Sequence, residues 1–159
     1  MAKSFTEQEI IGIINEEAGK LNIPVIIDDT MPWQLYLSGC STYEGYSNAE
    51  DLSVHMILES WVNFVDRLDS IVEKLGIFGS ITSWARRPEK ILRETIRDLL
   101  VHEGRHIEQL EYLKNKGIDQ LQYVKNQNAK NYWLRRYEID AYLVQCTGIR
   151  LPLKWVLGV

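Results

Sequence analysis

One long amphipathic segment, residues 87–114, constrains this chain more than any other feature. Arg87, Pro88 and Glu89 look like the start of a helix, because proline is tolerated in the first turn and an acidic residue there faces the positive end of the helix dipole. Gly117 suits a C-cap. We therefore predict a helix of roughly 28 residues, about 42 Å long. Its apolar stripe consists of Ile91, Leu92, Ile96, Leu99, Leu100, Ile107, Leu110 and Leu113.

The residues around this helix predict an α+β fold. Capping boxes near Ser4 and Thr6 open a first helix, and alternating apolar and polar residues from Leu52 indicate a half-buried strand. The expected elements are a helix at 5–20, strands at 23–27, 33–37, 43–46 and 52–58, a helix at 61–75, a loop at 76–86 and a last helix at 129–146 that ends at Gly148 and Pro152. This order, without a glycine-rich phosphate loop, argues against a βαβ nucleotide-binding fold. We expect one domain, residues 1–159, with a small N-terminal sheet packed on the long helix.

The long helix contains the pentapeptide His102-Glu103-Gly104-Arg105-His106, an HExxH motif. Residues four apart lie on one helix face about one turn apart, so both imidazoles can point at a single cation. Glu103 lies about 100° round the helix from His102, close enough to touch a metal-bound water. A glycine is unfavourable inside a helix, so Gly104 indicates that another backbone or a substrate approaches closely there.

A catalytic zinc ion usually takes three protein ligands, so the two histidines need a partner. His55 lies in a predicted strand, where a lone histidine is more often packed or hydrogen-bonded than a ligand. Glu138 is the better candidate, because it lies 32 positions after His106 on a separate predicted helix that a turn can fold back. The alternative for Glu138 is an ordinary surface ion pair with Arg135 or Arg136.

HExxH followed by the segment Glu138 to Tyr142, Glu-x-x-Ala-Tyr, resembles the gluzincin metallopeptidases, specifically their smallest members. The resemblance covers about residues 95–145. It implies a zincin-like domain in which His102, His106 and Glu138 bind Zn²⁺ and a sheet edge holds a peptide or protein substrate. It also implies that Glu103 is the catalytic base, which takes a proton from the zinc-bound water and passes it to the leaving amine.

The sequence departs from the larger thermolysin-like members four residues after the ligand glutamate. Those proteins have an aspartate there that accepts a hydrogen bond from a metal histidine, whereas this chain has Tyr142. We expect Tyr142 to replace it as the acceptor or to face the substrate, and Asp98 is another candidate acceptor. Tyr137, Tyr142 and Arg105 are the candidates for stabilising an oxyanion.

Composition argues against a nucleic-acid-binding, secreted or membrane-spanning protein. The formal charge of −4 provides no basic surface for nucleic acid. The first residues lack the apolar core of a secretion signal, and no run approaches the length of a membrane span. We therefore expect a cytoplasmic protein with Cys40 and Cys146 as free thiols.

Two other functions stay open from the sequence. The chain could be a catalytically weak or inactive zinc-binding protein that acts through a protein partner. Glu103 and His106 also form an ExxH pair, as in carboxylate-bridged di-iron proteins, but that site needs a second ExxH, which this chain lacks.

Overall fold

The computed structural model describes residues 4–32, 44–76, 87–131 and 134–159. It is mixed α/β and mostly helical, with a three-stranded sheet and six helices in these residues. The elements are α1 (Glu7–Leu21), β1 (Val25–Asp28), β2 (Gly45–Asn48), β3 (Ser53–Ile57), α3 (Leu58–Gly76), α4 (Arg87–Asn115), α5 (Gln120–Asn128), α6 (Arg136–Thr147) and α7 (Leu153–Leu157). The strand expected at 33–37 and Cys40 lie outside the described residues. So does the loop expected at 76–86, apart from its first residue, Gly76, which ends α3.

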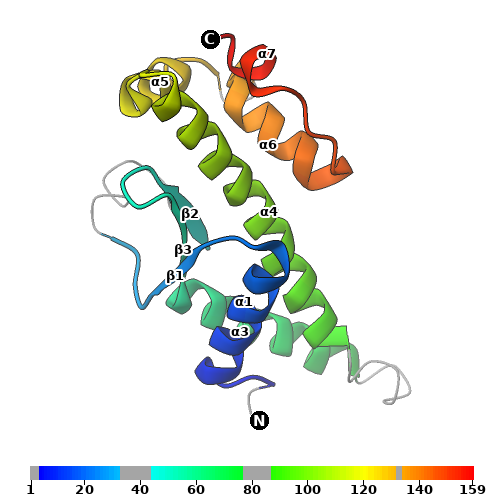
Figure 1. Ribbon diagram of the computed structural model, residues 1–159. Coiled ribbons are helices and arrows are strands. Elements are labelled where there is room, and N and C mark those ends of the chain that lie inside the picture. Colours follow the sequence, from blue (N-terminus) through cyan, green and yellow to red (C-terminus); the bar gives the residue numbers. More distant parts are fainter. Residues whose placement is uncertain (1–3, 33–43, 77–86, 132–133) are drawn as a thin grey trace.

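Helix α4 is the central rod of the molecule (Figure 1). It has 29 residues, which confirms the predicted long helix. In Figure 1 the sheet lies beside its middle, α1 and α3 lie beside its N-terminal half, and α5, α6 and α7 lie around its C-terminal half. The two ends of the chain lie at opposite ends of the molecule. Residues from the middle of α4 are therefore enclosed between the sheet and α6.

The sheet has the order β1-β3-β2, in which β1 and β3 are parallel and β2 and β3 are antiparallel. Gly45 at the start of β2 allows close packing, because a Cβ there would lie 2.8 Å from the carbonyl oxygen of His55 and 3.2 Å from Leu99 Cδ2 on α4. Among the described strands, β2 lies at the edge of the sheet.

Strand β3 is buried on both faces, whereas the alternating pattern predicted a half-buried strand. Val54 and Met56 belong to the main core. The other face is closed by polar groups: His55 Nδ1 lies 2.7 Å from Asp28 Oδ2, and its Nε2 lies 2.9 Å from Asp51 Oδ2. A polar strand face can be buried when its groups are hydrogen-bonded. The alternation of apolar and polar residues therefore did not show that both faces of β3 are buried.

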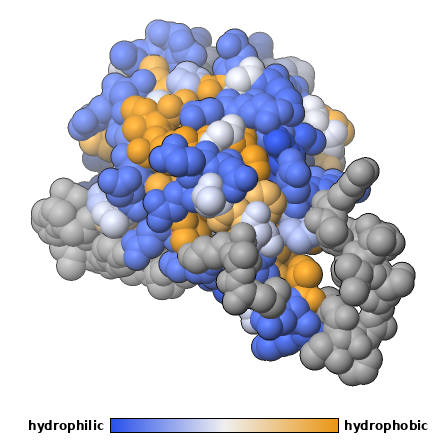
Figure 2. Space-filling view, turned by 90° about the horizontal axis from the view of Figure 1, so that it is seen from below, coloured by the Kyte–Doolittle hydropathy of each residue, from blue (hydrophilic) through white to orange (hydrophobic). Residues whose placement is uncertain are grey.

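The main core lies where α1, α3 and the sheet pack on α4. The Trp61 side chain is fully buried there, and its Nε1 donates a hydrogen bond to the carbonyl oxygen of Glu44, just before β2. On the face shown in Figure 2, hydrophilic residues surround a smaller apolar area. No helix in the described residues combines the length and the apolar character that crossing a membrane requires.

The helix boundaries confirm part of the prediction and correct part of it. Thr6 and Glu9 form the expected capping box, and Gly148 ends α6 in the left-handed conformation with φ 72°. The single last helix predicted at 129–146 is wrong at its start, because α6 begins at Arg136. A separate helix, α5, precedes it and is capped by the Asp119 side chain, which accepts from the backbone N–H of Gln122.

Candidate metal centre

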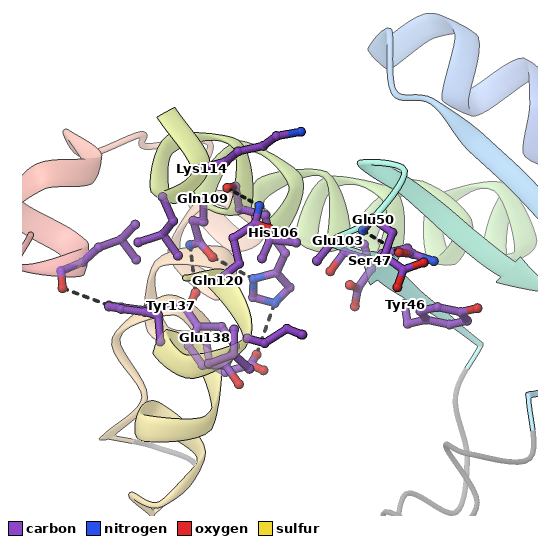
Figure 3. A pocket seen from close by; sticks show the side chains of 18 residues that line it. Tyr46, Ser47, Glu50, Glu103, His106, Gln109, Lys114, Gln120, Tyr137 and Glu138 are labelled. Atoms are coloured by element: carbon purple, nitrogen blue, oxygen red, sulfur yellow. Dashed lines mark hydrogen bonds and ion pairs between the residues drawn. The ribbon is translucent and has the colours of Figure 1, made fainter. Parts of the chain in front are cut away.

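His102, His106 and Glu138 come together between α4 and α6 and could hold a metal ion. Figure 3 shows two of them, His106 and Glu138. The Nε2 atoms of the two histidines lie 3.2 Å apart. Glu138 Oε2 lies 3.3 Å from His102 Nε2 and 3.6 Å from His106 Nε2. One face of α4 supplies both imidazoles, as the four-residue spacing predicts, and the first turn of α6 supplies the carboxylate.

The three side chains are largely withdrawn from solvent. His102 and His106 are buried, and only 14% of the Glu138 side chain is exposed. Glu138 therefore makes a buried contact with both imidazoles and is not the solvated ion-pair residue that the sequence left as an alternative. A carboxylate and two imidazoles enclosed with their ligand atoms converging are the donor set that divalent transition metals prefer.

The two kinds of ligand affect each other's protonation. Burial disfavours the charged carboxylate of Glu138, but its contacts with the imidazoles of His102 and His106 outweigh burial and lower its pKa. Burial also disfavours the charged imidazole of His106, but the nearby carboxylates of Glu138 and Glu103 outweigh burial and raise its pKa. The site thus favours a negatively charged Glu138 carboxylate facing imidazoles that can take up a proton or a metal ion.

Tyr142 and Tyr137 cover the two imidazoles. The Tyr142 ring meets His102 edge-on with centroids 4.6 Å apart, and the Tyr137 ring meets His106 with centroids 5.3 Å apart. Burial, and then the charge of Glu138, raises the pKa of Tyr137 to about 12, so its hydroxyl stays protonated at neutral pH. Of the two tyrosines, Tyr137 lines the open groove described next.

A groove of about 990 Å³ opens beside the triad. Residues 46–50 of β2 and the turn after it line one side, and Leu121 and Val124 of α5 are among the residues that line another. Glu103 and Glu138 both line the groove, and Figure 3 places Glu103 between His106 and the β2 segment. The exposed fraction of Glu103 is 9%. The groove therefore borders Glu103 and two of the three residues of the triad, His106 and Glu138.

Two expectations about the surroundings of the histidines are wrong. His102 Nδ1 is buried without a hydrogen-bond partner among the described residues, so neither Asp98 nor the Tyr142 hydroxyl is its acceptor. The ring is turned so that Nε2 meets the other triad atoms, which leaves Nδ1 enclosed. The other role expected of Tyr142, that it faces the substrate, stays a prediction. Arg105 does not face the groove as an oxyanion stabiliser, since its guanidinium bonds Asp140, Glu108 and the carbonyl oxygen of Leu151.

Sequence reasoning missed Gln109, whose Oε1 lies 2.8 Å from His106 Nδ1. Its signal was available, because residue i+3 lies on the same helix face as the histidine. The prediction for His55 is confirmed: it is hydrogen-bonded in the sheet and is not part of the triad. What approaches Gly104 is a side chain and not the backbone or substrate that the sequence predicted, since a Cβ there would lie 2.7 Å from Ile23 Cδ1.

Comparisons of this chain with protein-family models, with curated proteins and with solved structures find no match.

Proposed function

We propose that this chain is a zinc-dependent peptidase of the gluzincin type. The observation that carries the proposal is the spacing of the triad. Three ligand atoms bound tetrahedrally at zinc's usual distances of about 2.0–2.1 Å lie about 3.3 Å from one another. The corresponding distances in this chain are 3.2, 3.3 and 3.6 Å. Two histidines and a glutamate are also the ligand set of a known class of catalytic zinc site.

When bound, Zn²⁺ would polarise the scissile carbonyl and lower the pKa of a water molecule. The carboxylate of Glu103 is the group that accepts the proton from the attacking water, and it returns the proton to the leaving amine nitrogen. Glu103 suits this role because it lines the groove and is not one of the three ligands.

The substrate in this proposal is an extended peptide or a protein segment. Residues 46–48 of the edge strand β2 line the groove and can pair with a peptide backbone. Beyond His106 the groove has apolar lining residues, which are Leu110 and Leu113 from α4 and Leu121 and Val124 from α5. A large apolar side chain of the substrate fits this part of the groove.

The test is Glu103→Gln in the zinc-loaded protein, assayed on an unfolded protein substrate. Removing a general base costs about 10²–10⁴-fold in rate. We expect that loss with zinc still bound at one per chain. Glu111→Gln, an exposed position on the same helix, is the control and should keep full activity. Cleavage that survives in Glu103→Gln would refute the proposal. A wild type that binds zinc stoichiometrically and cleaves no peptide would refute it in favour of a zinc-binding protein that acts through a partner.

A further inference from the structure

Gln109 lies between a metal-ligand histidine and the helix that carries the third ligand. It is 3% exposed. Its Oε1 faces His106 Nδ1 at 2.8 Å, and its Nε2 faces Asp140 Oδ2 at 2.8 Å and the carbonyl oxygen of Tyr137 at 3.0 Å. All the hydrogen-bonding atoms of this amide are therefore used inside the protein.

The partners on α6 determine which way the amide points. A backbone carbonyl can only accept a hydrogen bond, so the oxygen of Tyr137 must face the NH₂ group of Gln109. Asp140 accepts from Arg105, whose Nε lies 2.6 Å from Oδ2 and whose Nη2 lies 3.2 Å from Oδ1. A guanidinium has no acceptor atom, so it too holds Asp140 as an acceptor. The amide oxygen of Gln109 is left facing the imidazole of His106.

The ion pair of Arg105 and Asp140, which holds the Gln109 amide, is itself buried. Arg105 is 4% exposed and Asp140 is 2% exposed. Arg105 also donates to the carbonyl oxygen of Leu151 at 2.8 Å, beyond the end of α6. Such a charged pair, held through two N–H groups and enclosed by the protein, has few other arrangements available. It fixes α6 against α4, and with α6 it fixes Gln109.

We propose that Gln109 is a positioning residue that holds neutral His106 in the Nδ1–H tautomer, so that Nε2 presents its lone pair to the metal centre. An amide oxygen can only accept, so Nδ1 must donate. The proposal rests on the proposed metal site, but the tautomer itself follows from contacts that contain no metal.

The same contacts make the two histidines unequal. With a lone pair on His106 Nε2, the hydrogen belongs to the facing His102 Nε2, which lies 3.2 Å from His106 Nε2 and 3.3 Å from Glu138 Oε2. His102 Nδ1, which has no hydrogen-bond partner among the described residues, then carries the lone pair of that ring. His106 is therefore set for a metal in advance, whereas His102 must move its proton from Nε2 before that nitrogen can bind one.

The test has two readouts. The first is the tautomer of His106 in the metal-free wild-type protein, read from long-range ¹H–¹⁵N spectra at a pH where the ring is neutral. The second is the zinc affinity of Gln109→Met, measured by competition with a chelator. Gln127→Met is the control, because Gln127 is also a buried glutamine (7% exposed) and its contacts are with Lys130 and the backbone of Arg136.

We expect His106 to be protonated at Nδ1 and not at Nε2. We expect Gln109→Met to bind zinc about 10–100-fold more weakly, and Gln127→Met to bind it as the wild type does. An Nε2–H tautomer of His106 in the wild type would overturn the proposal, and this reading does not depend on any variant folding. Unchanged zinc affinity in folded Gln109→Met would also overturn it. If the wild type binds no zinc, the proposed function fails, while the tautomer spectrum still decides the present inference.

Discussion

Glu17 on α1 tests how the helices around the candidate metal centre are held together. Its side chain is fully buried, yet it is bonded by three cations. Arg97 donates to Oε2 from Nε at 3.0 Å and from Nη2 at 2.8 Å. Arg93 and Lys20 donate to Oε1 at 3.1 and 3.0 Å. Because both arginines belong to α4, this carboxylate joins α1 to the helix that bears the HExxH motif.

The structure sets the expected magnitude of Glu17→Gln. Burial opposes the charged form of Glu17, but the hydrogen bonds from Arg97, Lys20 and Arg93 outweigh it and lower the pKa from 4.5 to about 2. At about 1.4 kcal/mol for each pH unit, this difference corresponds to about 3 kcal/mol of folding free energy at neutral pH. Half of the Lys20 side chain is exposed, and nearly half of that of Arg97, so solvent screening reduces the figure. We expect a loss of about 2–3 kcal/mol.

Urea unfolding at pH 7 and pH 3 measures this loss. A carboxylate with a lowered folded pKa stabilises the protein above its unfolded pKa, and its contribution disappears as the pH falls through the folded pKa. The difference between the wild type and Glu17→Gln should therefore shrink by roughly half between pH 7 and pH 3. Glu16→Gln is the control, since Glu16 also contacts Lys20 and Arg93 but is half exposed. We expect Glu16→Gln to cost clearly less than Glu17→Gln, because solvent screens its ion pairs. Equal losses for the two variants, or a Glu17 effect independent of pH, would refute this reasoning.

Three other regions give further predictions. Burial opposes the imidazolium of His55, but hydrogen bonds with Asp51 and Asp28 raise its pKa, so its stabilising effect is complete below about pH 6.5 and disappears as the pH rises through the folded pKa. The difference in melting temperature between the wild type and His55→Asn should therefore fall from pH 6 to pH 9, and a constant difference would contradict it. Gly45→Ala should lower the unfolding free energy by about 1–3 kcal/mol in urea titrations, because a Cβ there would lie 2.8 Å from a carbonyl oxygen of β3; an unchanged midpoint would show that the sheet can shift at no cost. Leu121→Ser should lower kcat/KM for peptides with a large apolar side chain about three- to tenfold, while Ile71→Ser on α3 should not; equal effects would remove Leu121 from the substrate groove.

The parts of the fold that the sequence predicted are those with strong local signals. Helix α4 has a long apolar stripe, and α1 has a capping box, so both were found close to their observed bounds. Helix α5 was missed because it buries only Tyr123 and Gln127, and its last residues are polar. Residues 136–147 were recognised as helical, but the start of that helix was placed too early, because its N-cap is Arg135, which makes no side-chain capping hydrogen bond and is not a residue type that marks a helix start.

In the candidate site, too, the sequence predicted what depends on local spacing and missed what depends on how the helices pack. The triad was predicted because four-residue spacing on one helix is local, and only Glu138 needed a second element. The contacts from His106 through Gln109 to Asp140 and Arg105 depend on how α6 lies against α4, which no local pattern determines. For the same reason the expected acceptors for His102 were wrong: the rotation of its ring is set by the packing of α6 and not by the residue four positions before it.

The central claim is that both HExxH histidines and Glu138 hold one metal ion. X-ray absorption at the zinc edge, on wild-type protein loaded with one zinc per chain, tests it most directly. The account predicts two imidazole nitrogens and carboxylate oxygen at about 2.0–2.2 Å, and zinc that is lost or rebound elsewhere in Glu138→Ala. A spectrum with fewer than two imidazoles, or with sulfur at about 2.3 Å, would contradict it.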